Sequence, residues 1–287
     1  MTFVTRLAPS PTGFLHRGHA FSALTAFRAA REVGGRFLLR IEDIDRTRCR
    51  PEYEAAIYED LAWLGLEWET PVLRQSERTQ AYQAALDRLR GQGLLYRCFR
   101  TRREILDDIA RAPHGPGEGP DGVVVRGAAL PPDQEAALLD AGRPYAWRLS
   151  LDRAREALGP AWDALSFVEE GAGPNGETGL IPARPETAGD VVLARKDVGV
   201  AYHLAVVVDD AAQGVTHVIR GCDLFAAAHV QRLLQALLDL PAPLYRHHRL
   251  LTDAQGRRFA KRDKAETLRE LRAAGVTAEA LRRELCL

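Results

Sequence analysis

Hydrophobic positions in the first hundred residues switch between short runs and helical spacing. Apolar runs predict strands over residues 2–7 and 36–41, and apolar side chains recurring every three to four positions predict helices over 20–32, 51–64 and 78–91. Strands and helices therefore alternate along this part of the chain. Because parallel strands are usually joined through a helix, this order predicts an α/β fold with a parallel sheet.

The pattern changes after residue 110. Two stretches rich in proline, glycine and charge, 111–132 and 171–185, predict the irregular parts of an inserted subdomain. We expect later strands to complete the sheet that begins at the N-terminus. The later elements are strands over 191–193, 205–208 and 215–219, an amphipathic helix over 229–238, and two short helices after Asp263.

These elements predict a division of the chain into four parts. Two separate segments form the sheet domain, an inserted α/β subdomain lies between them, and a short helical segment follows. The corresponding residues are 1–97 and 188–246 for the sheet domain, 98–187 for the insertion, and 247–287 for the C-terminal loop and helices.

The composition narrows the class of protein. With 287 residues and 46% hydrophobic content, the chain can form an ordinary soluble core. It has no run of about 18 apolar residues and no basic, apolar leader, so we expect a cytoplasmic protein without a membrane partner. The net charge of zero neither suggests nor excludes an RNA partner. The four cysteines show no Cys-x-x-Cys spacing, so neither a disulfide framework nor a zinc knuckle is indicated.

A candidate nucleotide site lies between the first strand and the first helix. Residues 8–13 predict a turn, and His16-Arg17-Gly18-His19 follows it directly. Gly13 and Gly18 would let the backbone approach a ligand, and His16 and His19 could donate to phosphate oxygens beside a helix N-terminus. The alternatives are a histidine pair that starts a helix without binding a ligand, or a metal-binding pair at i, i+3 spacing.

Three further groups of charged residues carry candidate chemistry. Glu42 follows the strand 36–41, at the kind of sheet edge where ligands bind, and could hold an ammonium group. Arg220 follows the apolar run 215–219 and could pair with a ligand carboxylate. The basic, glycine-led loop around Lys261 could close over a polyphosphate. Each has a plain alternative, which is a solvated turn with internal ion pairs or an ordinary surface arginine or loop.

Taken in order, these segments resemble the glutamyl branch of the class I aminoacyl-tRNA synthetases. Residues 6–19 resemble its HIGH region, 40–48 its Arg-Ile-Glu-Asp segment, 202–221 its amino-acid pocket and 258–262 its KMSKS loop. The resemblance covers nearly the whole chain and implies a Rossmann-type nucleotide-binding catalytic domain. It further implies that the glutamate pocket is lined by Arg6, Ser10, Glu42, Tyr202 and Arg220, and that ATP, as its Mg2+ complex, is handled by His16, Gly18, His19 and Lys261.

Within this branch, the chain resembles the truncated members most. Only 25 residues follow Arg262, so we expect no anticodon-binding domain. The truncated members attach glutamate to queuosine in the anticodon of tRNA(Asp). The resemblance therefore implies L-glutamate, ATP and tRNA(Asp) carrying queuosine as partners, and we expect a monomer.

The chain also departs from the family pattern. Relatives often carry a zinc site that starts with Cys-x-Cys in the insertion, whereas here Cys98 stands alone and the next cysteine is Cys222, so zinc is not expected. Arg17 replaces an apolar residue, and Arg258 and Ala260 replace the usual Lys and Ser of the loop. Two other functions stay open, a non-catalytic tRNA-binding paralogue and another HxGH nucleotidyltransferase that makes a small-molecule adenylate.

Overall fold

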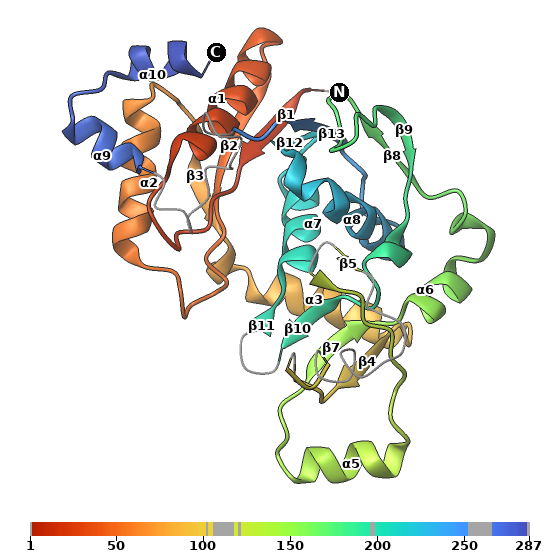
Figure 1. Cartoon of the computed structure of the whole chain (residues 1–287). Helices are drawn as coiled ribbons and strands as arrows, with labels where there is room; N and C mark the ends of the chain where they lie inside the picture. The colour runs from red at the N-terminus through yellow and green to blue at the C-terminus, as the bar shows by residue number, and fades with distance from the viewer. Residues whose placement is uncertain are drawn as a thin grey trace.

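The N-terminal third of the chain forms a three-stranded parallel sheet with helices between its strands (Figure 1). The computed structural model describes residues 2–101, 103–105, 118–119, 122–195, 199–251 and 266–285. The sheet has the order β1-β2-β3, with both pairs parallel, which confirms the parallel arrangement predicted from the β-α-β pattern. Its elements are β1 (Val4–Leu7), α1 (Arg17–Glu32), β2 (Arg36–Ile41), α2 (Pro51–Trp63), β3 (Glu69–Arg74) and α3 (Thr79–Gly91).

A second sheet continues from the first. The backbone N–H of Thr216 donates to the Val4 carbonyl at 2.9 Å, so β12 (His217–Gly221) lies beside β1. From β12 the order runs through β13 (Leu244–His248) and β8 (Ser166–Glu169), which are parallel, to β9 (Gly179–Pro182), which is antiparallel. Of the later segments expected to complete the N-terminal sheet, 215–219 lies beside it as β12, whereas 191–193 falls largely in β10 (Val192–Arg195), which belongs to a separate antiparallel sheet.

The segment predicted as a strand over 205–208 is a helix. Tyr202–Ala212 form α7, which packs against α3 and against α8 (Phe225–Leu237). The prediction was wrong because a short, continuous apolar run is equally compatible with a buried strand and with a helix enclosed on several sides. Leu204 to Val207 are all almost fully buried, so no polar face revealed the helical period.

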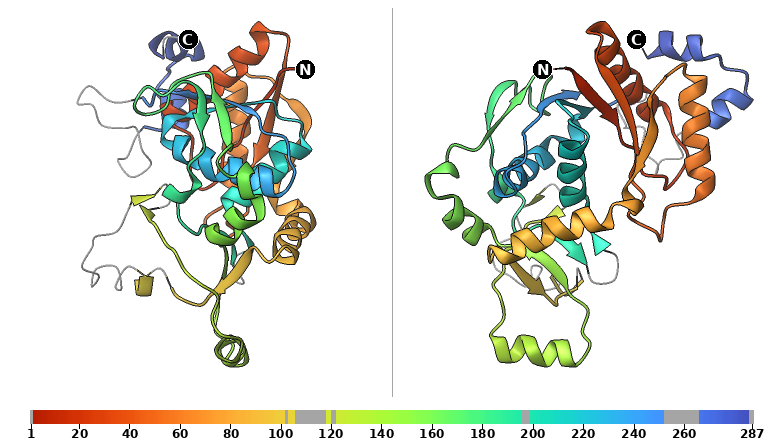
Figure 2. Two further views of the ribbon diagram at one scale, coloured as in Figure 1. Left: turned by 90° about the vertical axis from the view of Figure 1, so that its right-hand side faces the viewer. Right: turned by 180° about the vertical axis from the view of Figure 1, so that it is seen from behind.

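The third sheet lies away from the N-terminal strands. It is antiparallel, with the order β11-β10-β7-β4, and α5 projects beyond it at the opposite end of the molecule from the C-terminal helices (Figures 1 and 2). Its strands are β4 (Leu95–Cys98), β7 (Ala146–Leu149), β10 (Val192–Arg195) and β11 (Gly199–Val200). Nearby elements are the small hairpin of β5 (Glu118–Gly119) and β6 (Gly122–Val123), α5 (Pro132–Asp140) and α6 (Leu151–Leu158).

The chain returns to the N-terminal core at its C-terminal end. The two predicted short helices are α9 (Leu268–Ala273) and α10 (Ala278–Glu284). Leu268 and Leu281 are buried in the same hydrophobic cluster as Leu24 of α1, Leu39 of β2 and Ile57 of α2. The C-terminal helices therefore help to fix the helix that carries the histidine motif. None of the helices in the described part of the chain is long and apolar enough to cross a membrane.

Candidate active site

A cavity of about 590 Å³ brings together the predicted site residues. It lies where β1, β2 and β12 end, the edge of a parallel sheet at which ligands are expected. Of the nine residues that the resemblance implies, eight line it and the ninth, Lys261, lies outside the described residues, while Gly13 of the predicted turn is not among the lining residues. The eight are Arg6, Ser10, His16, Gly18, His19, Glu42, Tyr202 and Arg220.

The two histidines of the motif cap the helix on which they stand. Helix α1 begins at Arg17, three residues before the predicted start, because His16 serves as its N-cap. The Gly18 N–H donates to His16 Nδ1 at 3.1 Å, and the His16 N–H donates to His19 Nδ1 at 3.2 Å. Since both Nδ1 atoms accept, each neutral ring carries its proton on Nε2. The motif therefore presents two Nε2–H groups from a fixed helix start.

The segments that flank residues 252–265 both lie at this motif. Leu250 and Leu251 line the cavity on one side. On the other, Thr267 forms a β-bridge with His16, and the Leu268 N–H donates to the Leu15 carbonyl at 2.8 Å.

Arg17, which stands in the motif where an apolar residue is usual, also holds the C-terminal segment against α1. Its guanidinium pairs with Glu266 and with Glu284, at 2.9 Å each. A charged residue here therefore holds the C-terminal helices rather than a ligand.

A buried network of four charges supports one wall of the cavity. Arg6 donates to both oxygens of Asp210, from Nε at 3.0 Å and from Nη2 at 3.1 Å. Arg40 Nη1 donates to Asp210 Oδ1 at 2.7 Å, and Arg40 Nη2 donates to Glu42 Oε1 at 3.1 Å. Asp210 on α7 thereby links strands β1 and β2 and holds Arg6 and, through Arg40, Glu42 at the cavity.

The pKa values of the two carboxyl groups in this network are shifted in opposite directions. Burial raises the pKa of Asp210, but the adjacent Arg6 and Arg40 guanidiniums outweigh it and lower that pKa to about 2. Burial dominates at Glu42, so its pKa is raised even though Arg40 and Arg6 oppose the rise. Asp210 is therefore the firm anion of the network. The charged form of Glu42 would be stabilised by a further cation, such as a ligand ammonium.

Arg220 lies on β12, and its environment differs from that of Arg6. Its side chain donates from Nε to His247 Nε2 at 3.0 Å, from Nη1 to Gln231 Oε1 at 3.0 Å, and from Nη2 to the Leu224 carbonyl at 3.0 Å. Arg220 Nη1 also lies 3.5 Å from the Tyr202 hydroxyl. All of these are uncharged acceptors, so the guanidinium is fixed in place without being neutralised by direct contact.

His247, which contacts Arg220, lies on β13 and is itself held by Glu169 on β8. His247 is the register partner of Arg220, and its Nδ1 lies 2.5 Å from Glu169 Oε2. Glu169 Oε1 also accepts the backbone N–H of His247 and of Gly171, at 2.8 Å each. Burial and the nearby Arg220 lower the pKa of His247, although Glu169 opposes this, so the ring stays neutral with its proton on Nδ1.

Several residues that build the site were assigned no role from the sequence. Arg40 and Asp210 stand in or next to apolar runs, in Phe37–Ile41 and after Val206–Val208, and a charge in such a run signals a buried pair. Glu169, Gln231 and His247 give no comparable signal. They meet Arg220 or each other only through strand register and helix packing.

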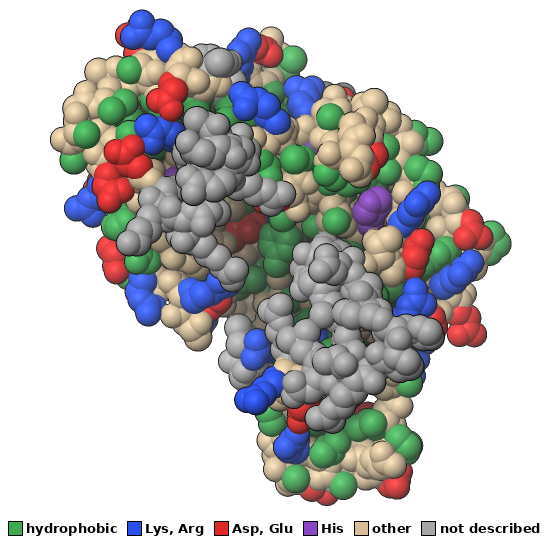
Figure 3. Space-filling view, viewed as in Figure 1, with side chains coloured by type: hydrophobic (Ala, Val, Ile, Leu, Met, Phe, Trp, Pro, Cys, Tyr) green, Lys and Arg blue, Asp and Glu red, His purple; other side chains and the backbone are tan. Residues whose placement is uncertain are grey.

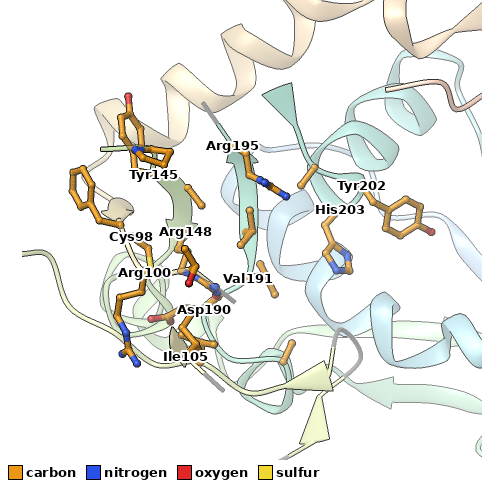
Figure 4. Close-up of a pocket in the computed structure, with 18 residues that line it drawn as sticks. Cys98, Arg100, Ile105, Tyr145, Arg148, Asp190, Val191, Arg195, Tyr202 and His203 are labelled. Carbon is orange, nitrogen blue, oxygen red and sulfur yellow. The ribbon is translucent and has the colours of Figure 1, made fainter. Parts of the chain in front are cut away.

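A second cavity of about 530 Å³ adjoins the first through Tyr202, which lines both. Figure 4 shows Tyr202 and His203 at one end of it and Cys98, Arg100 and Tyr145 at the other. In the part of the chain that is described, no group of three or more His, Cys, Asp or Glu side chains is arranged to hold a metal ion. Basic and acidic side chains intermingle over the face in Figure 3, rather than forming one basic patch.

Comparison with known proteins identifies close relatives of this chain. A family model described as "tRNA synthetases class I (E and Q), catalytic domain" matches residues 2–287. The chain is 48% identical to the glutamyl-Q tRNA(Asp) synthetase of Rhodobacter capsulatus, with 98% of both chains covered. It is 42% identical to the protein of the same name from Symbiobacterium thermophilum, with 96% of this chain and 82% of that one covered.

Longer relatives match over about half of their length. The glutamate–tRNA ligase of Parasynechococcus marenigrum is 40% identical, with 96% of this chain but 56% of the ligase covered. The crystal structure of glutamate-tRNA synthetase from Elizabethkingia anophelis superposes with a TM-score of 0.72 at 27% identity, covering 92% of this chain and 53% of that one. The fold and the sequence thus lead to the same group of proteins.

Proposed function

Because the chain belongs to the catalytic-domain family of the class I tRNA synthetases for Glu and Gln, and is a ligase, we propose that it activates L-glutamate with ATP and transfers it to queuosine in the anticodon of tRNA(Asp). The observation that carries the proposal is the single cavity that joins a buried carboxylate, Glu42, a buried cation, Arg220, and the paired histidines of the motif. These groups match an ammonium, a carboxylate and a phosphate chain, respectively.

In this proposal, glutamate lies between Glu42 and Arg220. Glu42 accepts from the α-ammonium, which favours the charged form of a carboxyl whose pKa burial raises. Arg220 binds the side-chain carboxylate, since its guanidinium contacts only uncharged acceptors among the described residues. Arg6 and Ser10 line the same cavity and complete the pocket, with Tyr202.

The first chemical step forms glutamyl-adenylate. An oxygen of the glutamate α-carboxylate attacks the α-phosphorus of ATP, and the bond to the β,γ-phosphates breaks, so pyrophosphate leaves with its bonding electron pair. Negative charge on the phosphate oxygens is met by the Nε2–H groups of His16 and His19 and by Lys261, while Mg2+ accompanies the ATP. No covalent enzyme intermediate is required. The assignment of Lys261 rests on the sequence motif.

The second step moves the glutamyl group to a hydroxyl of the queuosine cyclopentenediol, and AMP leaves. Two observations support this acceptor. The relatives that match over most of their own length are named glutamyl-Q tRNA(Asp) synthetase. The second cavity shares Tyr202 with the glutamate pocket, which supports entry of an unstacked nucleoside from that side.

The test compares acceptors with labelled glutamate and ATP. We expect labelling of tRNA(Asp) that carries queuosine, and none of queuosine-free tRNA(Asp) or of tRNA(Glu). Charging of tRNA(Glu), or of tRNA(Asp) without queuosine, rejects the acceptor but keeps the activation chemistry.

Glutamate-dependent exchange of pyrophosphate into ATP tests the first step separately. We expect exchange with glutamate. Its complete absence favours a non-catalytic tRNA-binding paralogue. Exchange with a different small acid, and not with glutamate, favours another nucleotidyltransferase.

A further inference from the structure

Among the described residues, every group that accepts a hydrogen bond from the side chain of Arg220 is uncharged. Arg220 is 6% exposed, and its three nitrogens donate to a histidine nitrogen, an amide oxygen and a backbone carbonyl. A buried cation is normally stabilised by a carboxylate in direct contact. Here the nearest carboxylate in this set, Glu169, acts on Arg220 only through the ring of His247.

The ring of His247 is locked as an acceptor. Nδ1 keeps the ring proton and donates it in a hydrogen bond to Glu169 Oε2, which leaves Nε2 unprotonated toward the Arg220 Nε–H. Both His247 and Glu169 have side chains with no exposed surface, so water does not substitute for either contact. The strand pairing of β12 with β13 places His247 directly beside Arg220.

Gln231 is the second uncharged acceptor. It lies on α8, is 2% exposed, and its Oε1 faces Arg220 Nη1 at 3.0 Å. Its amide orientation is determined by that contact, since a guanidinium nitrogen can only donate. Its Nε2 has no hydrogen-bond partner within the described parts of the chain. A buried donor without a partner is unfavourable, and a glutamate here would accept from Arg220 without carrying such a donor.

We propose that Gln231 and His247 are specificity-determining positioning residues. They fix the Arg220 guanidinium with uncharged acceptors, so that its charge is kept for the side-chain carboxylate of the substrate. A carboxylate in either place would fix Arg220 equally well but would compete with the substrate. This inference rests on the proposed activation of glutamate, and it assigns the preference for an acid over an amide to these two residues acting through Arg220.

The decisive variant is Gln231→Glu, measured in the full-length protein by pyrophosphate exchange. The change replaces the unpartnered NH2 by an oxygen of nearly the same size and places a carboxylate about 3 Å from Arg220. We expect the glutamate KM to rise by about 30-fold or more, with kcat at saturating glutamate and the KM for ATP each within about threefold of wild type. The ratio of glutamate to glutamine exchange should fall by about tenfold or more, and this ratio does not depend on the fraction of active enzyme.

Two matched variants separate charge from packing. Gln235→Glu makes the same substitution one turn along α8, where the side chain bonds the Tyr245 hydroxyl at 3.3 Å instead of Arg220. We expect it to leave the glutamate KM within about threefold of wild type. Gln231→Met removes the acceptor without adding charge, and we expect a KM rise of no more than about tenfold.

A parallel pair of variants tests His247. His247→Leu removes the acceptor for Arg220 Nε, and we expect the glutamate KM to rise. His247→Gln places an amide oxygen near the position of Nε2, and we expect it to recover most of the wild-type KM. Equal losses in both variants would show a requirement for the ring itself and would contradict the proposal.

The outcomes are distinct from failure of the proposed function. If the wild-type protein shows no glutamate-dependent exchange, the proposed function fails and the inference fails with it. If the wild type is active and Gln231→Glu keeps its glutamate KM, only the inference is overturned. The same holds if Gln231→Glu, Gln231→Met and Gln235→Glu all raise KM alike, because the effect is then one of packing or of buried charge in general.

Discussion

The two buried arginines of the cavity are stabilised in opposite ways. Arg6 meets both oxygens of Asp210, a carboxylate whose pKa is lowered to about 2. Arg220 meets a histidine nitrogen, an amide oxygen and a backbone carbonyl. Both side chains are about 5% exposed, so burial alone does not distinguish them. The difference lies in whether the charge is already balanced by a direct partner.

This difference indicates which arginine serves the framework and which serves the ligand. A paired cation such as Arg6 gains little from a second anion, and removal of its partner leaves an uncompensated buried charge. A cation held by neutral acceptors keeps most of its attraction for an incoming carboxylate. The comparison therefore predicts effects on stability around Arg6 and effects on substrate preference around Arg220.

The largest effect is expected for Asp210→Asn. The amide would place N–H donors against the guanidiniums of Arg6 and Arg40, both of which lose their shared anion. We expect a loss of about 3–5 kcal/mol in the free energy of unfolding, measured by urea denaturation. Gln231→Met, which removes a neutral acceptor of Arg220, should lower the free energy of unfolding by about 1–2 kcal/mol. Equal costs in the two variants would contradict the contrast between the arginines.

The preference for glutamate over glutamine tests the role of Arg220. Glutamine has the shape of glutamate, but its neutral amide leaves the buried guanidinium without a counter-charge. We expect kcat/KM for pyrophosphate exchange to be lower with glutamine by a factor of about 30 or more, equivalent to about 2–5 kcal/mol. Comparable exchange with both amino acids would show that Arg220 does not meet the side-chain carboxylate.

A smaller effect follows from the pKa of Asp210. Because this pKa is lower in the folded protein than its ordinary value near 4, the stabilisation is fully present above that value and is lost as the pH falls toward about 2. Its size is about 2 kcal/mol. We expect the difference in unfolding free energy between wild type and Asp210→Asn to shrink between pH 5 and pH 3. A constant difference over this range would place the stabilisation elsewhere.

Much of the framework followed from the sequence because periodic patterns report on local structure. Strand β2 has the predicted bounds, 36–41, and helices α2 and α3 match their predictions within about one residue. The prediction failed where the pattern is degenerate, in the buried run of α7. The predicted start of α1 was three residues too late, because the side chain of His16 caps the helix.

The site was predictable only in part. Motif order led to Arg6, Glu42 and Arg220, and the structure brings all three to one cavity. The state of each charge could not be predicted, since Arg6 and Asp210 are 204 positions apart and Arg220 and His247 meet only through strand register. The sequence contains the partners, but three-dimensional packing decides which arginine is neutralised.

The smallest effect is expected at a third arginine, Arg17, which is half-buried but pairs with exposed carboxylates. Arg17 pairs with Glu266 and Glu284, whose side chains are 49% and 51% exposed. Water and salt screen such pairs, so Arg17→Ala should lower the unfolding free energy by no more than about 1 kcal/mol, and less at high salt. Urea denaturation at low and high ionic strength measures this. A loss as large as that of Asp210→Asn would mean that docking of α9 and α10, rather than burial of charge, controls stability around the motif.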